Sequence, residues 1–371
     1  MAVPLVTVAF LIVGVVCASM FWPLQLYQSA PGRAQDVSSR LEISGTDRQL
    51  FEPENGVRFV TALGTELTPL QAFMGWVDPY VDVLTCEERF GVCEPVLDRE
   101  IQLGAMTSAK EIASYVALTY VGIAAELNEG PAQVAGFDPD LCPADAPAKR
   151  ACRVLAVGDV ITAVDLGEGE IQIDVVSQLG EVLATAKPGD IATLTVQSLP
   201  ASGTSSSPSN PPQRQVEVEL LASPDDPNRV LIGFNPRDTR TVSLPFDIKI
   251  DTDRIGGPSA GLSFVLALID VLTPGELAPP GGVAATGTIA ADGRIGPIGL
   301  LVQKVIAVKQ SGIRYLIVPT AQGEAEIQRA REVVGSDVEI IPVATLDEAV
   351  QAVAALGGVE PPKRVDSPAE I

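Results

Sequence analysis

A helix-forming segment at residues 259–272 constrains the fold of this chain more than any other feature. Apolar side chains lie on every face of the predicted helix, and the run Gly-Gly-Pro-Ser-Ala-Gly at 256–261 leads into it. A helix that is apolar all round must be buried, so other elements have to surround it. Strands and helices are predicted to alternate after residue 229, which indicates an α/β layered domain. The predicted strands are 230–234, 242–250, 282–289, 315–318 and 338–341, and the predicted helices are 259–272, 300–311, 324–334 and 346–356.

The serine of this run, Ser259, stands where a nucleophile could be held. Pro258 suits the first turn of a helix because it lacks an N–H group that the turn does not need. The backbone N–H groups near the serine, at Gly257 and Ala260, then fall among donors without helical partners, which can stabilise an oxyanion. The chain contains no histidine, so a Ser-His-Asp triad and an HExxH zinc site are both excluded.

Another base is needed, and Lys304 is the best candidate. It is one of seven lysines and is flanked by Leu301, Val302, Val305 and Ile306. Burial lowers the pKa of a lysine from about 10.4, and a decrease of about three units leaves it roughly half neutral near pH 7. A neutral lysine can act as a general base. Each motif alone is also compatible with a tight strand–helix turn or with a surface lysine.

Two further motifs lie between the serine and the lysine: Thr-Gly-Thr-Ile at 286–289 and Asp-Gly-Arg-Ile-Gly-Pro-Ile-Gly at 292–299. With them, residues 228–356 resemble the proteolytic domain of the Lon proteases. The resemblance implies that Ser259 is the nucleophile, Lys304 the base and Thr286 a hydrogen-bond partner of the lysine. Gly256 stands where many members carry an acidic residue, and Leu300 replaces a common glycine.

The middle of the chain resembles a PDZ domain. Two motifs support this resemblance. One is the turn Leu-x-x-Gly-Asp-x-Ile-x-x-Val at 155–164, and the other is the Pro-Gly-Asp at 188–190, which precedes a predicted strand. We expect this β-rich domain at 108–222, beginning with a helix capped by Ser108 and containing an insertion at 138–153. Residues 199–212 are low in complexity and predict a flexible hairpin tip. Residues 223–227 predict the boundary to the next domain.

The N-terminus is apolar. No charged side chain occurs between residues 2 and 26, and Trp22 and Tyr27 lie near the end of this run. About 20 apolar residues span a bilayer, and Trp and Tyr favour its interfaces. A cleaved signal peptide is the alternative, although its apolar core is usually only about 7–15 residues long. We therefore expect a retained transmembrane helix at 1–28. Residues 36–107 form a membrane-proximal region of unclear fold, in which 57–60 and 81–84 suggest strands and 70–76 suggests a helix, and no chemistry is visible there.

Four cysteines beyond this segment form two local pairs, Cys86 with Cys93 and Cys142 with Cys152. They predict two disulfides and hence an oxidising compartment, although four reduced thiols remain the alternative. The net charge of −22 argues against nucleic acid as a partner. We expect a single-pass protein of the cell membrane with its catalytic domain outside the cytoplasm.

The whole layout is that of a multidomain α/β (α+β) chain: a transmembrane helix, a PDZ-like β-rich domain, a C-terminal Lon-type α/β proteolytic domain and a flexible tail at 357–371. It resembles the bacterial membrane-anchored, PDZ-containing Lon-like proteases. No G-x-x-x-x-G-K-[ST] motif is present, so we expect an ATP-independent serine endopeptidase that acts on protein or peptide substrates and needs no cofactor or metal. A homo-oligomer is compatible with the resemblance. The alternative is a catalytically silent PDZ scaffold that binds peptides at the membrane.

Overall fold

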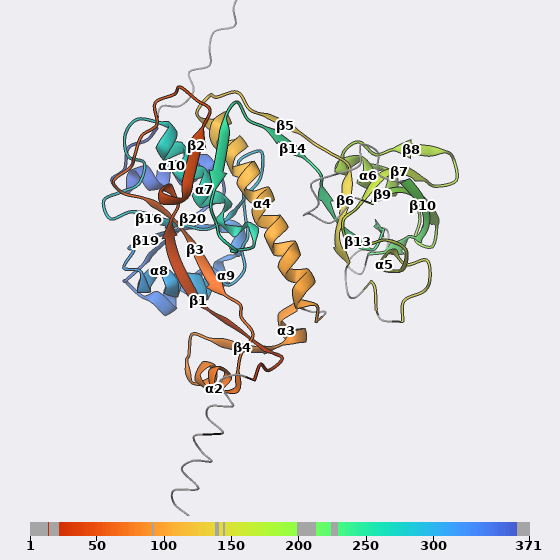
Figure 1. Ribbon diagram of the computed structural model, residues 1–371, viewed down its shortest axis with the longest axis horizontal. Coiled ribbons are helices and arrows are strands. Elements are labelled where there is room, and N and C mark those ends of the chain that lie inside the picture. Colours follow the sequence, from red (N-terminus) through yellow and green to blue (C-terminus); the bar gives the residue numbers. More distant parts are fainter. Residues whose placement is uncertain are drawn as a thin grey trace, which may run out of the picture. The chain divides into compact units, whose positions relative to one another are not determined.

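The chain forms two compact units in the computed structural model (Figure 1). The first unit combines the chain up to Glu126 with the chain from Ser243 onward, and the second is Leu127–Val242. The second unit is therefore an insertion within the first. The described residues are 14, 22–90, 93–137, 141–143, 145–198, 213–223 and 229–361.

A six-stranded sheet is the framework of the first unit, with the order β20-β19-β16-β3-β1-β4. Strands β3, β16, β19 and β20 run parallel, and β1 is antiparallel to both β3 and β4. Half of the sheet thus comes from the N-terminal part of the chain, whose fold the sequence left unassigned. The bounds are β1 (Leu26–Asp36), β3 (Val57–Leu63), β4 (Asp82–Thr85), β16 (Val283–Ala285), β19 (Tyr315–Pro319) and β20 (Glu339–Val343).

Helix α7 (Gly261–Leu272) lies at the centre of this unit, and all of its residues from Gly261 to Val271 are buried. This confirms that the all-apolar segment is surrounded. The long helix α4 packs along α7, while α8 packs against α9, β1 and β3. The remaining elements are η1 (Ser38–Arg40), β2 (Leu41–Ser44), α2 (Pro69–Val77), α3 (Cys86–Phe90), α4 (Pro95–Tyr120), β15 (Asp247–Ile250), η2 (Pro258–Ala260), β17 (Thr288–Ile289), β18 (Ile295–Gly296), α8 (Leu301–Gln310), η3 (Thr320–Gln322), α9 (Glu324–Val334) and α10 (Leu346–Ala355).

The predicted helix start at Ser108 is wrong, because α4 begins at Pro95 and Ser108 lies within it. Proline at the first helical position explains the observed start, since its fixed φ suits a helix and no N–H is lost. The polar residues that resembled an N-terminal helix cap lie instead in the middle of α4. Because α4 packs on α7, it belongs to the first unit, and the second unit starts at Leu127 rather than at residue 108.

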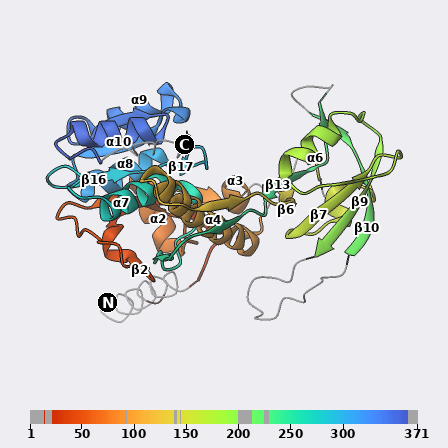
Figure 2. The ribbon, with the colours of Figure 1, turned by 90° about the horizontal axis from the view of Figure 1, so that it is seen from above.

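The second unit is built on a sheet with the order β10-β9-β7-β6-β13 (Figure 2). Strand β8 pairs with β7. Strand β9 falls directly after the Pro-Gly-Asp at 188–190, where a strand was predicted. Short strands β11 and β12 pair across the predicted boundary at 223–227, so the chain stays in this unit until Val242. The bounds are β5 (Glu126–Asn128), β6 (Ala132–Phe137), α5 (Ala151–Val154), β7 (Asp159–Asp165), β8 (Glu170–Gln172), α6 (Val176–Leu183), β9 (Ile191–Ser198), β10 (Gln213–Glu219), β11 (Leu221–Ala222), β12 (Val230–Leu231), β13 (Phe234–Asp238) and β14 (Thr241–Ser243).

The Gly-Asp turn before β7 has a clear physical basis. Gly158 has a φ of +95°, a region that glycine enters at little cost. The Asp159 carboxylate accepts hydrogen bonds from the Ala156 N–H at 2.8 Å and the Ser198 hydroxyl at 2.7 Å, and it also pairs with Arg214. Through Ser198 and Arg214, Asp159 thus connects the tight turn to β9 and β10.

Two expectations about the chain ends fall mostly outside the described residues. The predicted anchor covers residues 1–28, of which 26–28 belong to β1 and pair with β4, so its predicted end is too late. Among the residues that the structure describes, no helix has the length and apolar character needed to cross a bilayer. The hairpin tip at 199–212 and the tail from 362 onward also lie outside them. The first residues of the tail are attached to the first unit by a hydrogen bond, because the Val359 N–H donates to the Glu276 carbonyl.

Candidate active site

Ser259 lies in η2, at the turn that leads directly into the buried helix α7. Gly257 has a φ of +93°, which favours glycine because a Cβ is poorly tolerated there. Gly261 has no room for a side chain either, since a Cβ would lie 2.8 Å from Ile289 Cγ2. The serine is half-buried, so it is held by a rigid helix while it stays open to the surface.

Lys304 reaches the serine from helix α8. Its Nζ donates hydrogen bonds to Ser259 Oγ at 2.8 Å and to Thr286 Oγ1 at 3.3 Å. Lys304 is only 4% exposed and Thr286 is fully buried. The structure therefore brings together the three side chains that the sequence singled out, from three separate elements.

Thr286 follows β16 directly and connects the serine to the sheet. Its hydroxyl donates to the Ser259 carbonyl at 3.1 Å, and its N–H donates to the Ile317 carbonyl of β19 at 3.0 Å. The next N–H, at Gly287, donates to the Ser259 carbonyl at 2.8 Å. The backbone of the serine is thus fixed to the sheet on one side and to α7 on the other.

Burial controls the charge of the amine. It lowers the pKa of Lys304 from 10.5 to about 7, because an ammonium loses its hydration in an apolar site. At neutral pH roughly half of the molecules then carry a free lone pair on Nζ. An amine in that state, within hydrogen-bonding distance of a hydroxyl, can accept its proton directly.

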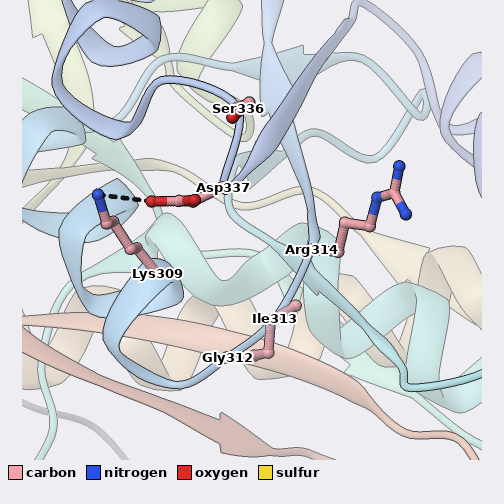
Figure 3. A pocket seen from close by; sticks show the side chains of 6 residues that line it. All are labelled: Lys309, Gly312, Ile313, Arg314, Ser336 and Asp337. Atoms are coloured by element: carbon pink, nitrogen blue, oxygen red, sulfur yellow. Dashed lines mark ion pairs between the residues drawn. The ribbon is translucent and has the colours of Figure 1, made fainter.

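Lys309, five residues further along α8, provides a contrast. Its Nζ pairs with Asp337 at 2.7 Å, and that contact raises the pKa of Lys309 above its ordinary value. The residue lines a cavity of about 510 Å³ with Gly312, Ile313, Arg314, Ser336 and Asp337 (Figure 3). Two lysines of one helix therefore differ in charge state, and only Lys304 is suited to act as a base.

Helix α4 supplies a neighbour of the site that sequence reasoning missed. The Gln102 carbonyl accepts the Gly257 N–H at 2.7 Å, so this N–H, one of the two expected oxyanion donors, already has a partner. A Cβ at Gly256 would lie only 2.8 Å from the Cβ of Gln102. The close approach of α4 explains why glycine stands at 256. No local motif marks Gln102, which is distant in sequence.

The start of α8 accounts for the other unusual position. Leu300 has a φ of 61° and a ψ of 42°, the left-handed region that costs a residue with a Cβ about 1–2 kcal/mol. Its carbonyl accepts the Lys304 N–H at 3.0 Å. A glycine would adopt this conformation without strain, so the backbone at 300 keeps the shape that aims Lys304 even with leucine in place.

The predicted disulfides are formed at two places. Cys86 at the start of α3 is joined to Cys93, just before α4. Cys142 is joined to Cys152 of α5 in the second unit. Each disulfide closes a short loop, and neither cysteine pair contributes to the site around Ser259.

Comparison with known proteins finds a serine peptidase family to which this part of the chain is similar. Residues 252–356 match the Lon protease (S16) C-terminal proteolytic domain, in agreement with the resemblance seen in the sequence. The match contains Ser259, Thr286 and Lys304. A PDZ domain is among the structural neighbours, that of an SdrC-like protein from Listeria monocytogenes, with 18% identity, a TM-score of 0.20, and coverage of 29% of this chain and 86% of that one.

Proposed function

We propose that the protein is an ATP-independent serine endopeptidase that uses Ser259 and Lys304 as a catalytic dyad. The observation that carries this proposal is the 2.8 Å hydrogen bond between Lys304 Nζ and Ser259 Oγ, made by an amine whose pKa burial lowers to about 7. A nucleophile and a base within hydrogen-bonding distance are the minimum for covalent catalysis.

The neutral amine takes the serine proton while Oγ attacks the carbonyl carbon of the substrate peptide bond. The carbonyl oxygen becomes an oxyanion, for which we propose the Ala260 N–H at the start of α7 as a donor. When the C–N bond breaks, the Lys304 ammonium gives its proton to the departing amine and an ester to Ser259 remains. Water then attacks the ester with Lys304 again as the base, which releases the acid and restores the serine.

Thr286 acts as a positioning residue in this scheme. Its hydroxyl contacts both members of the dyad, since it accepts from Lys304 Nζ and donates to the Ser259 carbonyl. These two contacts restrict the amine to the serine side of the pocket. A displacement of about 1 Å between reacting groups can reduce a rate by about a hundredfold, so the restriction has kinetic value.

We propose extended segments of proteins or peptides as substrates, because the chain lacks an ATP-binding motif that could drive unfolding. The second unit is proposed to bind substrates or regulators in the manner of PDZ domains, by adding a peptide strand to a sheet edge. The two disulfides favour an oxidising compartment. We therefore propose that both units lie outside the cytoplasm, held to the cell membrane by the apolar N-terminal segment.

The test uses the full chain and an unfolded protein substrate. Ser259→Ala and Lys304→Met should each reduce cleavage by at least about a thousandfold, while Lys309→Met, the matched change on the same helix, should leave it unchanged. A fluorophosphonate probe should label the unaltered protein and fail to label Ser259→Ala. Full activity in either dyad variant contradicts the proposal. An unaltered protein that neither cleaves nor takes the probe would instead be a silent scaffold.

A further inference from the structure

Helix α2 carries an apolar surface on its outer side. Phe73, Met74, Trp76 and Val77 are 57–70% exposed, and Tyr80 just beyond the helix is 42% exposed. We call these five residues the α2 surface. No charged side chain occurs in α2. Contiguous apolar groups of this kind mark a place where a protein meets a partner or a membrane.

The helix that carries this surface is firmly built. Thr68 and Gln71 form a capping box at its start, and Pro69 occupies the first turn. On its inner side, a Cβ at Gly75 would lie 2.8 Å from Val83 Cγ2, so the helix rests closely on β4. The outer residues are therefore displayed by a fixed element rather than by a frayed end.

The apolar N-terminal segment arrives at the same place. The Leu24 N–H donates to the Leu67 carbonyl at 2.8 Å, and the Leu67 N–H donates to the Leu26 carbonyl at 2.8 Å. Leu67 is the residue before Thr68, the N-cap of α2. Trp22, only two residues before Leu24, is 74% exposed. Segment 2–21 ends three residues before Leu24, so it joins the first unit within about 10 Å of Leu24, at an extended rise of about 3.4 Å per residue.

The composition favours a lipid bilayer over a protein as the partner of the α2 surface. Segment 2–21 has no charged side chain and has the length of a membrane span. Tryptophan and tyrosine prefer the headgroup level of a membrane, and both tryptophans of the chain, Trp22 and Trp76, lie at this end. With a net charge of −22, the protein gains nothing from anionic headgroups, so apolar insertion is the mode of contact that remains.

We propose that the α2 surface inserts into the headgroup region of the bilayer that the N-terminal segment enters. This inference rests on the membrane attachment proposed above and adds a second contact to it. Two contacts on one rigid unit fix its orientation, whereas a single tether leaves it free to rotate. The end of the first unit that carries α2 and β4 then faces the membrane (Figure 1).

The test uses the two tryptophans as reporters in the full chain, reconstituted into phosphatidylcholine vesicles with and without brominated acyl chains. In Trp22→Phe the fluorescence comes from Trp76 alone, and in Trp76→Phe from Trp22 alone. We expect brominated lipids to remove most of the emission in both variants. Trp76 should be quenched more by bromine near the headgroups than by bromine near the chain ends.

A control tryptophan is placed on the same unit, far from α2. Val359 is an exposed apolar residue, 54% accessible, that follows α10, and Figure 1 shows α10 and α2 at opposite ends of the unit. Val359→Trp in a chain with both natural tryptophans changed to phenylalanine should keep its full emission in brominated vesicles.

Each other outcome overturns the inference in a recognisable way. Quenching of Trp22 without quenching of Trp76 leaves the membrane attachment in place and refutes insertion of α2. Quenching of neither tryptophan shows that the attachment itself fails. A Trp76 emission that is blue-shifted, unquenched and dependent on protein concentration shows that a second copy or another protein covers α2 instead.

Discussion

Replacing Lys304 with methionine should make the protein more stable while it removes activity. The two side chains have similar length, so the change mainly removes a buried charge. Burial lowers the pKa of Lys304 from 10.5 to about 7. At about 1.4 kcal/mol per pKa unit, the charge costs the folded state about 5 kcal/mol at low pH and about 4 kcal/mol at pH 7.

The measurement needs a Ser259→Ala background, which prevents self-digestion. In that background methionine gives up only the hydrogen bond to Thr286, worth about 1 kcal/mol. The net increase in the free energy of unfolding at pH 7 should therefore be about 3 kcal/mol. Between pH 7 and 10.5 the unfolded chain binds a proton that the folded chain has lost. The stability of the lysine protein thus rises with pH in this window, and the difference from the methionine variant shrinks.

Urea unfolding followed by circular dichroism at several pH values between 6 and 10 tests both the size of the stability difference and the rise of stability with pH. Lys309→Met is the control: its side chain is exposed and ion-paired, so its effect should stay below about 1 kcal/mol. The reasoning is refuted if methionine at 304 destabilises the protein at pH 7 and the lysine protein shows no change in stability from pH 7 to 10. The amine would then be solvated and could not act as the base.

Three further results are expected of the site. The rate of substrate cleavage should be half-maximal near pH 7 and fall about tenfold per unit at lower pH, because only the neutral form of Lys304 accepts a proton; a rate that is constant from pH 5 to 8 would exclude this base. Thr286→Val should lower kcat about tenfold to a hundredfold with little change in KM, since the amine loses a positioning contact; a raised KM with an unchanged kcat would indicate a binding role instead. Gly256→Asp should destabilise the first unit by about 1–3 kcal/mol through its clash with Gln102, and Gln102→Gly should recover part of the loss in thermal unfolding.

The sequence predicted the parts of the site that depend on local pattern. The buried helix α7, the turn before it and the apolar context of Lys304 are each visible within a dozen residues. Their order along the chain resembled one protein family, and that brought Thr286 into the same site. A pattern of this kind is readable because a buried helix, a strained turn and a desolvated amine each require particular residue types at fixed spacing.

The parts that could not be predicted depend on contacts between distant segments. Strand β3 pairs with β16, so that Val57 lies opposite Val283, and no local pattern in either strand identifies its partner. The approach of Gln102 to the serine turn has the same origin, because α4 is separated from η2 by the whole second unit. The start of α4 was misplaced because a polar stretch within a long helix resembles a cap.

The paired strands β5 and β14 place the exit from the first unit beside the point of return. Neighbouring ends of this kind let an entire domain be spliced into a host with few disturbed hydrogen bonds. The middle of the chain can accordingly be exchanged as a unit, or replaced by a short turn, while the first unit stays intact. Under the function proposed above, substrate binding and peptide-bond cleavage would then be free to evolve separately within one gene.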